Sequence, residues 1–338
     1  MQQRKHSVTI SDVAKAAGVS VSTVSRVLNG KDDVAKETEL HIQEVIQKLE
    51  YTSSLAARSM RSEKTNMIGL IMPDIAGAYA REIMLGVNRA IAESDHDLLL
   101  FTTGDVRKHE TASREQQYVS MLGNSITDGV IIVAPVTEVF SVETPIVSID
   151  PVMGHPGYPA IHATNYQGAL DAMNYLIGLG HRRIGFIAGR PELESAVRRL
   201  RGYQDALKQA NIELDESLIV TGDFTTGTAE ECARQLMDLQ EPPTAIFAAN
   251  DQSAIGVYHA ALERGLRIPE DMSLIGFDNL PEAAYLNLTT IDQFLSEMGY
   301  QATKTLFQLI EGKPLEKQIQ QMPTHLVVRN SCREIKAG

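Results

Sequence analysis

The sequence has 338 residues, of which 43% are hydrophobic and 22% charged, and its formal net charge is −12. This length suggests two or three domains, and no apolar run approaches the about 18 residues that a membrane span needs. The acidic balance argues against a nucleic-acid binder. However, residues 1–61 carry nine Lys and Arg against seven Asp and Glu. This N-terminal head therefore has a net charge of +2, and the remainder of the chain has a net charge of −14. Such a distribution suits a protein that touches nucleic acid only through its head.

Motifs of the common enzyme classes are missing from the sequence. The nine histidines form no metal-binding pair or cluster, and there is no nucleophile elbow, phosphate-binding loop or dinucleotide-binding glycine motif. Cys232 and Cys332 lie far apart in the sequence, which favours reduced thiols. The polar residues 1–6 predict no signal peptide. We therefore expect a cytoplasmic protein that is not an enzyme, binds no metal or cofactor, and has no contact with a membrane.

Residues 9–29 predict two short helices joined by a tight turn. In TISDVAKAA, residues 9–17, apolar side chains recur at helical spacing, and Thr9 or Ser11 can cap the N-terminus. Gly18 can adopt the left-handed conformation that ends a helix, and Ser20 can cap the second helix. The inner face of this second helix is predicted to hold Val24, Val27 and Leu28.

Two helices joined by a three-residue turn with glycine form a helix-turn-helix, in which the second helix enters the major groove of DNA. The outer face of the second helix suits this role, since Arg can fork onto guanine, Ser can donate or accept at any base, and Val can meet a thymine methyl. That face comprises Val21, Ser22, Ser25, Arg26 and Asn29. A third helix near Lys36–Leu49 would complete a three-helix head. The plainer alternative is an αα-hairpin inside a larger helical protein.

The segment VTISDVAKAAGVSVSTVSRVLNG, residues 8–30, resembles the N-terminal signature of the LacI/GalR repressor family almost position for position. The resemblance implies a sequence-specific transcriptional regulator that acts as a homodimer on double-stranded operator DNA. The candidate DNA-contacting residues are Thr9, Ile10, Ser11, Val21, Ser22, Thr23, Ser25, Arg26, Asn29 and Met60.

The same family then has a hinge segment, which the resemblance places at residues 51–65. Ser53 and Ser54 stand where the family usually has Pro-Asn, and Met60 stands where an intercalating Leu is expected. A segment of this length is too short to be a stable helix alone, so we expect Ser53–Met60 to become helical only when two copies meet on DNA. Met60 could then wedge into a base step of the minor groove. A plain linker is the alternative.

From Asn66 on, short apolar runs alternate with helical patterns, which is typical of βαβ units and parallel sheets. The runs of strand length are residues 67–74, 97–103, 129–135, 145–150, 183–189, 217–224, 244–251 and 273–279. Helical patterns lie between them at Ala80–Ala92, Tyr166–Gly180 and Ser253–Gly265. There are too many strands for one sheet, so two doubly wound halves are predicted, with Thr289–Phe294 crossing back between them and His325–Val328 as a final strand.

The predicted fold class is α/β: a three-helix helix-turn-helix head and a hinge helix, followed by two doubly wound parallel subdomains. The head spans residues 1–50, the hinge 51–65, and the effector-binding and dimerisation domain 66–338. Within the last, the N-subdomain comprises about 66–162 and 292–323, and the C-subdomain about 163–291 and 324–338.

Several predicted strands end in a polar residue, namely Asp74, Asp150, Asn250 and Asp278. Ligands of open α/β sheets bind at the carboxyl ends of the strands, so two facing sheets would gather these side chains in one cleft. Carboxylates and amides are good partners for hydroxyls, Arg198 or Arg199 could supply a fork, and Phe224 offers an apolar face to a sugar ring. For Asp74, capping the next helix is an equal alternative.

The body is also similar to the periplasmic-sugar-binding-like effector domain of the LacI/GalR family, through LGHRRIGFIAG, FAANDQSAIG, IPEDMSLIGFDN and LTTIDQ. An aromatic contact that is common in the family falls between Phe294 and Leu295. With the strand-end argument, the resemblance gives as candidate effector-binding residues Asp74, Tyr79, Asp150, Arg199, Phe224, Asn250 and Asp278. This set is rich in acids and poor in rings, which favours a sugar or sugar-derived effector.

We therefore expect a repressor of carbohydrate-use genes that its effector releases from the operator. A purine- or nucleoside-responsive repressor of the same fold is the first alternative. A cleft enzyme fused to a DNA-binding head and an exported solute-binding protein are further alternatives. The missing signal sequence and the N-terminal head argue against the exported protein.

Overall fold

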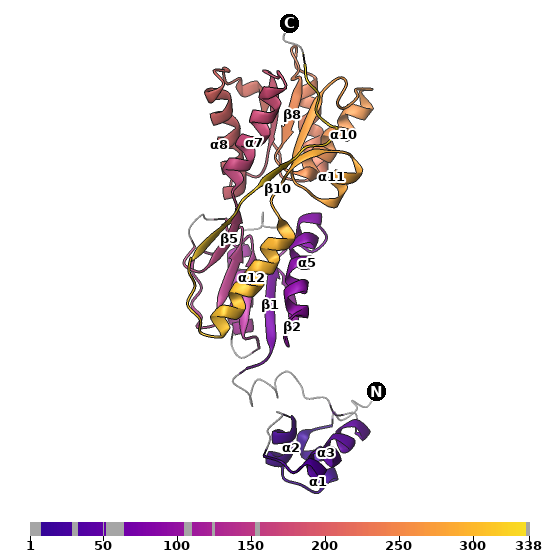
Figure 1. Cartoon of the computed structure of the whole chain (residues 1–338), viewed down its shortest axis with the longest axis vertical. Coiled ribbons are helices and arrows are strands. Elements are labelled where there is room, and N and C mark those ends of the chain that lie inside the picture. Colours follow the sequence, from indigo (N-terminus) through magenta and orange to yellow (C-terminus); the bar gives the residue numbers. More distant parts are fainter. Residues whose placement is uncertain are drawn as a thin grey trace. The chain divides into compact units, whose positions relative to one another are not determined.

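The computed structural model describes residues 8–28, 33–49, 51, 64–104, 110–123, 126–152 and 156–335 (Figure 1). The chain forms two compact units, Met1–Thr65 and Asn66–Gly338. Three of the predictions, namely Asn29, Met60 and the hinge helix at Ser53–Met60, lie outside the described residues.

The first unit contains the three expected helices, α1 (Ile10–Ala17), α2 (Val21–Leu28) and α3 (Lys36–Lys48). Thr9 and Asp12 form a reciprocal capping box at the start of α1, which satisfies amide groups that would otherwise lack a partner. Gly18 ends α1 in the left-handed conformation, with φ of 68°. The Ser20 hydroxyl accepts the amide of Thr23 at 3.1 Å and so caps α2 as predicted.

The core of the first unit is small and is formed by one face of each helix. It consists of Ile10, Val13, Ala14, Ala17, Val24, Ile42 and Tyr51. Leu28 was predicted to face inward, but it is the last residue of α2 and is 37% exposed. Tyr51, predicted to begin the hinge, is 8% exposed and its amide donates to the carbonyl of Ile46 at 3.0 Å. Its ring therefore belongs to the core of the head.

Replacing Thr9 with alanine should lower the free energy of unfolding of the head by about 1 kcal/mol, because the variant loses the hydroxyl that caps α1. Amide hydrogen exchange in the full chain, recorded over residues 1–65 as the temperature is raised, monitors the unfolding of the head and measures this loss. Ser11→Ala is the matched control, since Ser11 is exposed and lies inside α1 rather than at its cap. Equal effects of the two changes would contradict the assigned cap.

The second unit contains two six-stranded sheets, which confirms the predicted pair of doubly wound halves. The first sheet has the order β11-β5-β4-β3-β1-β2 and all its strands are parallel. Its strands are β1 (Met67–Met72), β2 (Asp97–Thr102), β3 (Gly129–Val133), β4 (Ile146–Ile149), β5 (Ala160–Ala163) and β11 (Ile319–Met322). Helices α5 (Ala78–Ala92), α6 (Thr111–Gly123) and α12 (Leu295–Ile310) belong to this half.

The second sheet has the order β12-β10-β9-β8-β6-β7, and only β12 runs antiparallel to its neighbour. Its strands are β6 (Ile184–Ala188), β7 (Ile219–Thr221), β8 (Ala245–Ala248), β9 (Ser273–Asp278), β10 (Thr289–Asp292) and β12 (His325–Val327). Its helices are α7 (Asn165–Gly178), α8 (Glu194–Gln209), η1 (Glu216–Leu218, a 3-10 helix), α9 (Thr226–Met237), α10 (Asp251–Glu263) and α11 (Pro281–Tyr285).

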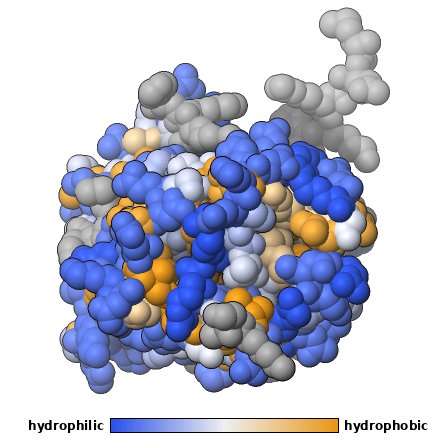
Figure 2. All heavy atoms as spheres, turned by 90° about the horizontal axis from the view of Figure 1, so that it is seen from above, coloured by the Kyte–Doolittle hydropathy of each residue, from blue (hydrophilic) through white to orange (hydrophobic). Residues whose placement is uncertain are grey.

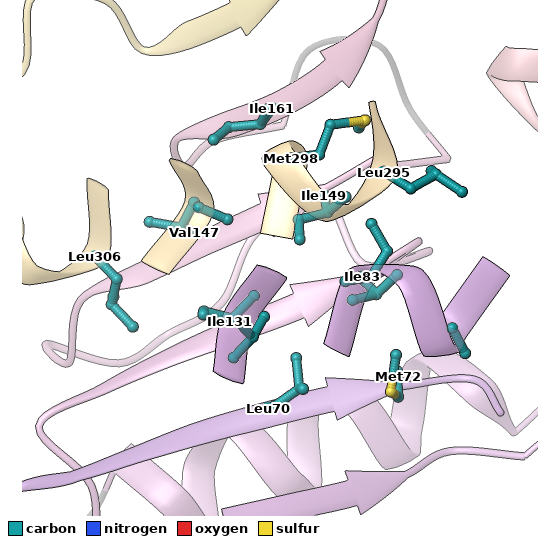
Figure 3. Packing of buried hydrophobic residues seen from close by; sticks show 14 of the residues in the cluster. Leu70, Met72, Ile83, Ile131, Val147, Ile149, Ile161, Leu295, Met298 and Leu306 are labelled. Carbon is teal, nitrogen blue, oxygen red and sulfur yellow. The ribbon is translucent and has the colours of Figure 1, made fainter. Parts of the chain in front are cut away.

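The chain crosses between the sheets after β5, after β10 and after β11 (Figure 1). The second crossing returns α12 to the first sheet, where it packs on α5. The two helices touch through their backbones, because a Cβ on Gly86 would overlap the carbonyl oxygen of Ser296 and one on Gly299 would overlap that of Ile83. Leu295, Met298 and Leu306 of α12 pack with the strand side chains into one core (Figure 3).

The face seen from above the view of Figure 1 is mostly hydrophilic, and its hydrophobic residues lie in small groups (Figure 2). None of the helices in the described part of the chain is long and apolar enough to cross a membrane.

Candidate ligand cleft and nucleic-acid interface

The second unit has a cleft of about 800 Å³ that is lined from both sheets. All seven candidate effector residues line it: Asp74, Tyr79, Asp150, Arg199, Phe224, Asn250 and Asp278. The carboxyl ends of β1, β3 and β4 meet those of the second sheet there, because parallel strands all point the same way within each sheet. The structure therefore brings the predicted residues together.

Arg199, on α8, is the buried centre of the cleft and is 3% exposed. Its Nε donates to Asn165 Oδ1 at 2.8 Å and its Nη1 donates to the Ala249 carbonyl at 2.5 Å. The guanidinium lies 3.7 Å from the centroid of the Phe277 ring and 3.6 Å from Asp278 Oδ1. Burial lowers the pKa of Arg199, while the charges of Asp278 and Asp150 act in the opposite direction.

Asp278 ends β9 with φ of 119°, a positive value that is uncommon for a residue other than glycine. Gln293 Nε2 donates to Asp278 Oδ1 at 2.5 Å, and Gln293 Oε1 lies 3.5 Å from Arg199 Nη2. Burial raises the pKa of Asp278 to about 7, against the lowering effects of Arg199 and Gln293. The carboxylate of Asp278 therefore takes up a proton more readily than that of an exposed aspartate.

Asp150 and Tyr79 form the opposite, first-sheet side of the cleft. Tyr79 donates its phenol proton to Asp150 Oδ2 at 2.8 Å. Burial raises the pKa of both groups, and the Asp150 charge raises that of Tyr79 further. The phenol is therefore a stable donor, and the remaining lone pairs of Asp150 can accept from a ligand.

Phe224 and Asn250 lie together on the second-sheet side. The Phe224 ring lies directly over Gly189, so a Cβ at that position would displace the ring. Asn250 is the N-cap of α10 and accepts the amide of Ser253 at 2.9 Å, while its Nδ2 donates to the Phe224 carbonyl at 3.1 Å. Asn250 thus fixes Phe224 and α10, and a ligand would have to share its amide.

Asp74 lines the cleft but is also committed to the turn before α5. Its Oδ1 accepts the amide of Ala76 at 2.9 Å and its Oδ2 accepts that of Gly77 at 3.2 Å. Asp74 therefore stabilises this turn rather than capping α5, whose N-cap is Gly77 without a side-chain hydrogen bond.

Several polar residues of the cleft were missed from the sequence, among them His162, Asn165 and Gln293. The first two flank the end of β5, a strand that the sequence did not predict. Gln293 lies in the crossover after β10, next to the positions where an aromatic contact was expected. That expectation is wrong, since neither Phe294 nor Leu295 lines the cleft, and Leu295 is 3% exposed in the core below it.

The cleft is bridged at its rim by an ion pair between its two halves. Arg81 Nη2 on α5 lies 3.1 Å from Glu282 Oε1 on α11, and both residues line the cleft. Neither side chain is buried, so this pair adds little to stability. Its position makes it sensitive to any closing or opening of the two halves.

On the head, the outer face of α2 is available to solvent. Val21 is 43% exposed, and Ser22 and Arg26 are also exposed, while Thr23 and Ser25 are half-buried. Arg26 Nη1 lies 3.1 Å from Asp33 Oδ2 in an exposed ion pair, which DNA phosphates or bases could replace.

Thr9 and Ser11 are exposed at the start of α1, where helix amides favour phosphate oxygens. Ile10 is 9% exposed, and its side chain packs in the core of the head. Ile10 is therefore part of the core of the head, and its contact with DNA stays a prediction.

No group of three or more His, Cys, Asp or Glu side chains in the described part of the chain is arranged to hold a metal ion. Cys232 and Cys332 are both free thiols.

Comparison with known proteins gives two family matches. Residues 9–54 match the model of bacterial regulatory proteins of the lacI family, and residues 173–332 match a periplasmic binding protein-like domain. The HTH-type transcriptional regulator DegA of Bacillus subtilis is 34% identical, with 96% of this chain and 97% of that protein covered. The HTH-type transcriptional repressor CytR of Escherichia coli is 30% identical, with 99% of both chains covered.

Two solved structures share the architecture. The lac repressor dimer bound to operator and the anti-inducer ONPF is 26% identical, with a TM-score of 0.86 and with 97% of this chain and 100% of that chain covered. The complex of the transcriptional regulator CelR with cellobiose is 30% identical, with a TM-score of 0.71 and with 96% and 99% covered. These likenesses extend over the head and the body alike, and the chain belongs to the lacI family of bacterial regulatory proteins.

Proposed function

We propose that this protein is a homodimeric repressor of carbohydrate-use genes that a small neutral sugar releases from its operator. The observation that carries the proposal is the cleft between the sheets, in which Asp150, Asp278 and Arg199 are held around one space. Carboxylate oxygens accept from hydroxyls and the guanidinium donates to them, so this set suits a polyhydroxyl ligand. The Phe224 ring adds an apolar face.

A purine or nucleoside is the second candidate, because the cleft also has two aromatic rings, Tyr79 and Phe224, one from each half. Two features favour the sugar. The Tyr79 hydroxyl is already bonded to Asp150, and the buried polar groups outnumber the rings. Among similar proteins, CelR has been solved with cellobiose and a regulator from Enterococcus faecium with ribose.

A thermal-shift screen of the purified protein tests this proposal. Ribose, cellobiose, other neutral mono- and disaccharides, purine bases and nucleosides are added over a range of concentrations. A sugar should give saturable stabilisation that grows with the logarithm of its concentration, without being converted. Stabilisation by purines or nucleosides alone would replace the sugar assignment. Formation of a product from the stabilising compound would favour an enzyme instead.

Replacing Arg26 with alanine should weaken binding to the preferred operator by about 1–3 kcal/mol and relax sequence choice at one position of each half-site. The operator is obtained by selection from random duplexes, and affinities are measured by fluorescence anisotropy at several salt concentrations. Lys48→Ala is the control, because it removes an exposed cation from α3 rather than from α2. It should change affinity similarly for all sequences, and an equal loss of specificity in both variants would count against α2 as the helix that reads the bases.

A further inference from the structure

The effector unit begins at Asn66, and the start of the chain there is held by polar contacts at one edge of the first sheet. Asp128 Oδ2 accepts the amide of Asn66 at 2.8 Å, and the Asn66 carbonyl accepts the amide of Asp97 at 2.8 Å. Asn66 has φ of 52°, in the left-handed region. These contacts lie where β1, β2 and β3 begin, which is the edge opposite to the cleft. They fix the direction in which the backbone enters β1.

The side chain of His96 lies close to that of Asp128 at this edge. Its Nε2 is 3.9 Å from Asp128 Oδ2, and the imidazole stacks on the ring of Phe307 with a centroid distance of 4.8 Å. The two polar side chains are 19% and 7% exposed. His96 Nδ1 is buried and has no hydrogen-bond partner among the described residues. A buried polar atom without a partner is costly, so this arrangement gains free energy if a neighbouring element shifts to relieve it.

That neighbouring element is α12, which connects this edge to the cleft. Its first residue, Leu295, comes two positions after Gln293, the cleft residue that bonds Asp278. Phe307 and Ile310 lie near its other end, and a Cβ on Gly129, which follows Asp128, would meet the side chains of Leu306 and Ile310 at 2.8 and 3.1 Å. At about 1.5 Å per residue, the helix spans about 24 Å. The helix therefore begins two residues after a residue that lines the cleft and ends beside the strand starts of the first sheet.

Helix α12 is held rigidly between the cleft and the starts of the strands by its packing on α5. Its backbone contact with α5 at Gly86 and Gly299 leaves no room for the helices to slide apart independently. The other end of α5 carries Tyr79 and Arg81 into the cleft. Close-packed interiors transmit small displacements because they contain little free volume. We therefore expect a displacement of α12 at its cleft end to reach the Phe307 ring, which stacks on His96.

We propose that α12 carries the state of the cleft to Asn66, the first residue after the predicted hinge at 51–65, through Phe307, His96 and Asp128, which act as positioning residues for Asn66. The role of this chain of contacts in regulation rests on the proposed function, in which a ligand controls DNA binding. The path itself is a property of the second unit and can be tested without effector or DNA. Failure of the ligand screen therefore does not decide it.

The test is amide hydrogen exchange, followed by mass spectrometry, on the full chain. Gln293→Ala perturbs the cleft end of α12, and Gln293→Asn is a milder second variant in case the first unfolds. Either change should speed exchange in a peptide covering residues 64–72 by about three- to tenfold. In a Phe307→Leu or a His96→Gln background, the same cleft change should have no further effect on this peptide, because the path is interrupted.

Phe140→Leu is the matched control, since Phe140 pairs with Tyr158, outside the core cluster beneath α12. In this background the effect of the cleft change on residues 64–72 should remain complete. The proposal is overturned if Gln293→Ala and Gln293→Asn both leave the exchange of residues 64–72 unchanged in the folded protein. It is also overturned if their effect persists at full size in the Phe307→Leu and His96→Gln backgrounds.

Discussion

Replacing Arg199 with alanine should lower the free energy of unfolding of the second unit by about 3–5 kcal/mol, because it breaks a buried charge pair from one side. The variant leaves Asn165 Oδ1 and the Ala249 carbonyl without their donor, and leaves Asp278 without its cation. It also opens a void beside Phe277, over which the guanidinium packs. Denaturant unfolding measured at neutral pH gives the change in free energy.

Part of this loss can be relieved by protonation of Asp278, whose pKa burial has already raised to about 7. The cost of Arg199→Ala should therefore be smaller at pH 6 than at pH 8. The variant should also lose the stabilisation that a sugar gives to the wild-type protein, since the fork that would bond its hydroxyls is gone.

Arg198→Ala, from the preceding position of α8, is the control for the change in stability only, because Arg198 also lines the cleft. The Arg198 side chain is 35% exposed and its Nε donates to Glu194 at 2.7 Å on the same helix. An exposed pair of this kind contributes about 0–1 kcal/mol. Similar losses in the two variants would show that Arg199 owes its effect to α8 in general rather than to the buried network.

The sequence was most informative where local rules decide the structure. Thr9, Gly18 and Ser20 mark the helix ends of the head by capping chemistry that acts within three or four residues. The long apolar runs contain β1 and β9 because fully buried parallel strands need continuous hydrophobic sequence. Each of these features is visible in a short window, which is why no knowledge of the rest of the chain was needed.

The two missed strands have weaker patterns. In β5 a histidine interrupts a run of only four residues, and β11 contains two glutamines because it is an edge strand whose side chains are partly exposed. Their identity depends on pairing with each other across more than 150 residues of sequence. A single-sequence pattern does not contain that information.

The residues of the cleft likewise divide into those that a local pattern reveals and those that depend on distant contacts. Asp150, Asn250 and Asp278 were found because the ends of parallel strands gather at one edge. Asn165 and Gln293 were missed, because their role arises from Arg199, which bonds both of them from another helix. The burial of Ile10 is likewise not visible in a short window, because its core partners include Ile42 of α3 and Tyr51.

Replacing Asp278 with asparagine should remove a pH dependence of stability between about pH 4 and pH 8. An aspartate in an unfolded chain has a pKa of about 3.9, and burial raises that of Asp278 to about 7 in the folded protein. Between these values the folded state binds the proton more tightly. The contribution of this group is therefore fully present below about pH 4 and is lost as the pH rises through about 7.

The difference in free energy of unfolding between Asp278→Asn and the wild-type protein should therefore grow in favour of the variant as the pH rises from 5 to 8. Asparagine tolerates the positive φ at this position and can still accept from Gln293, so the backbone and that bond are preserved. The Asp278 charge also raises the pKa of Asp251, which lies buried behind it. Removing that charge should make the contribution of Asp251 to the free energy of unfolding less dependent on pH. This change also favours the variant as the pH rises.

Asp271→Asn provides a control of opposite sign. Bonds from Arg267 hold the pKa of Asp271 below its usual value, so its contribution is present above the unfolded pKa and is lost as the pH falls through the lower, folded value. Its variant should therefore differ from the wild-type protein in acid rather than near neutrality. If Asp278→Asn instead runs parallel to the wild-type protein from pH 5 to 8, Asp278 is ionised throughout. The cleft would then present a permanent pair of carboxylates to its ligand, and an uncharged sugar would bind with an affinity independent of pH in that range.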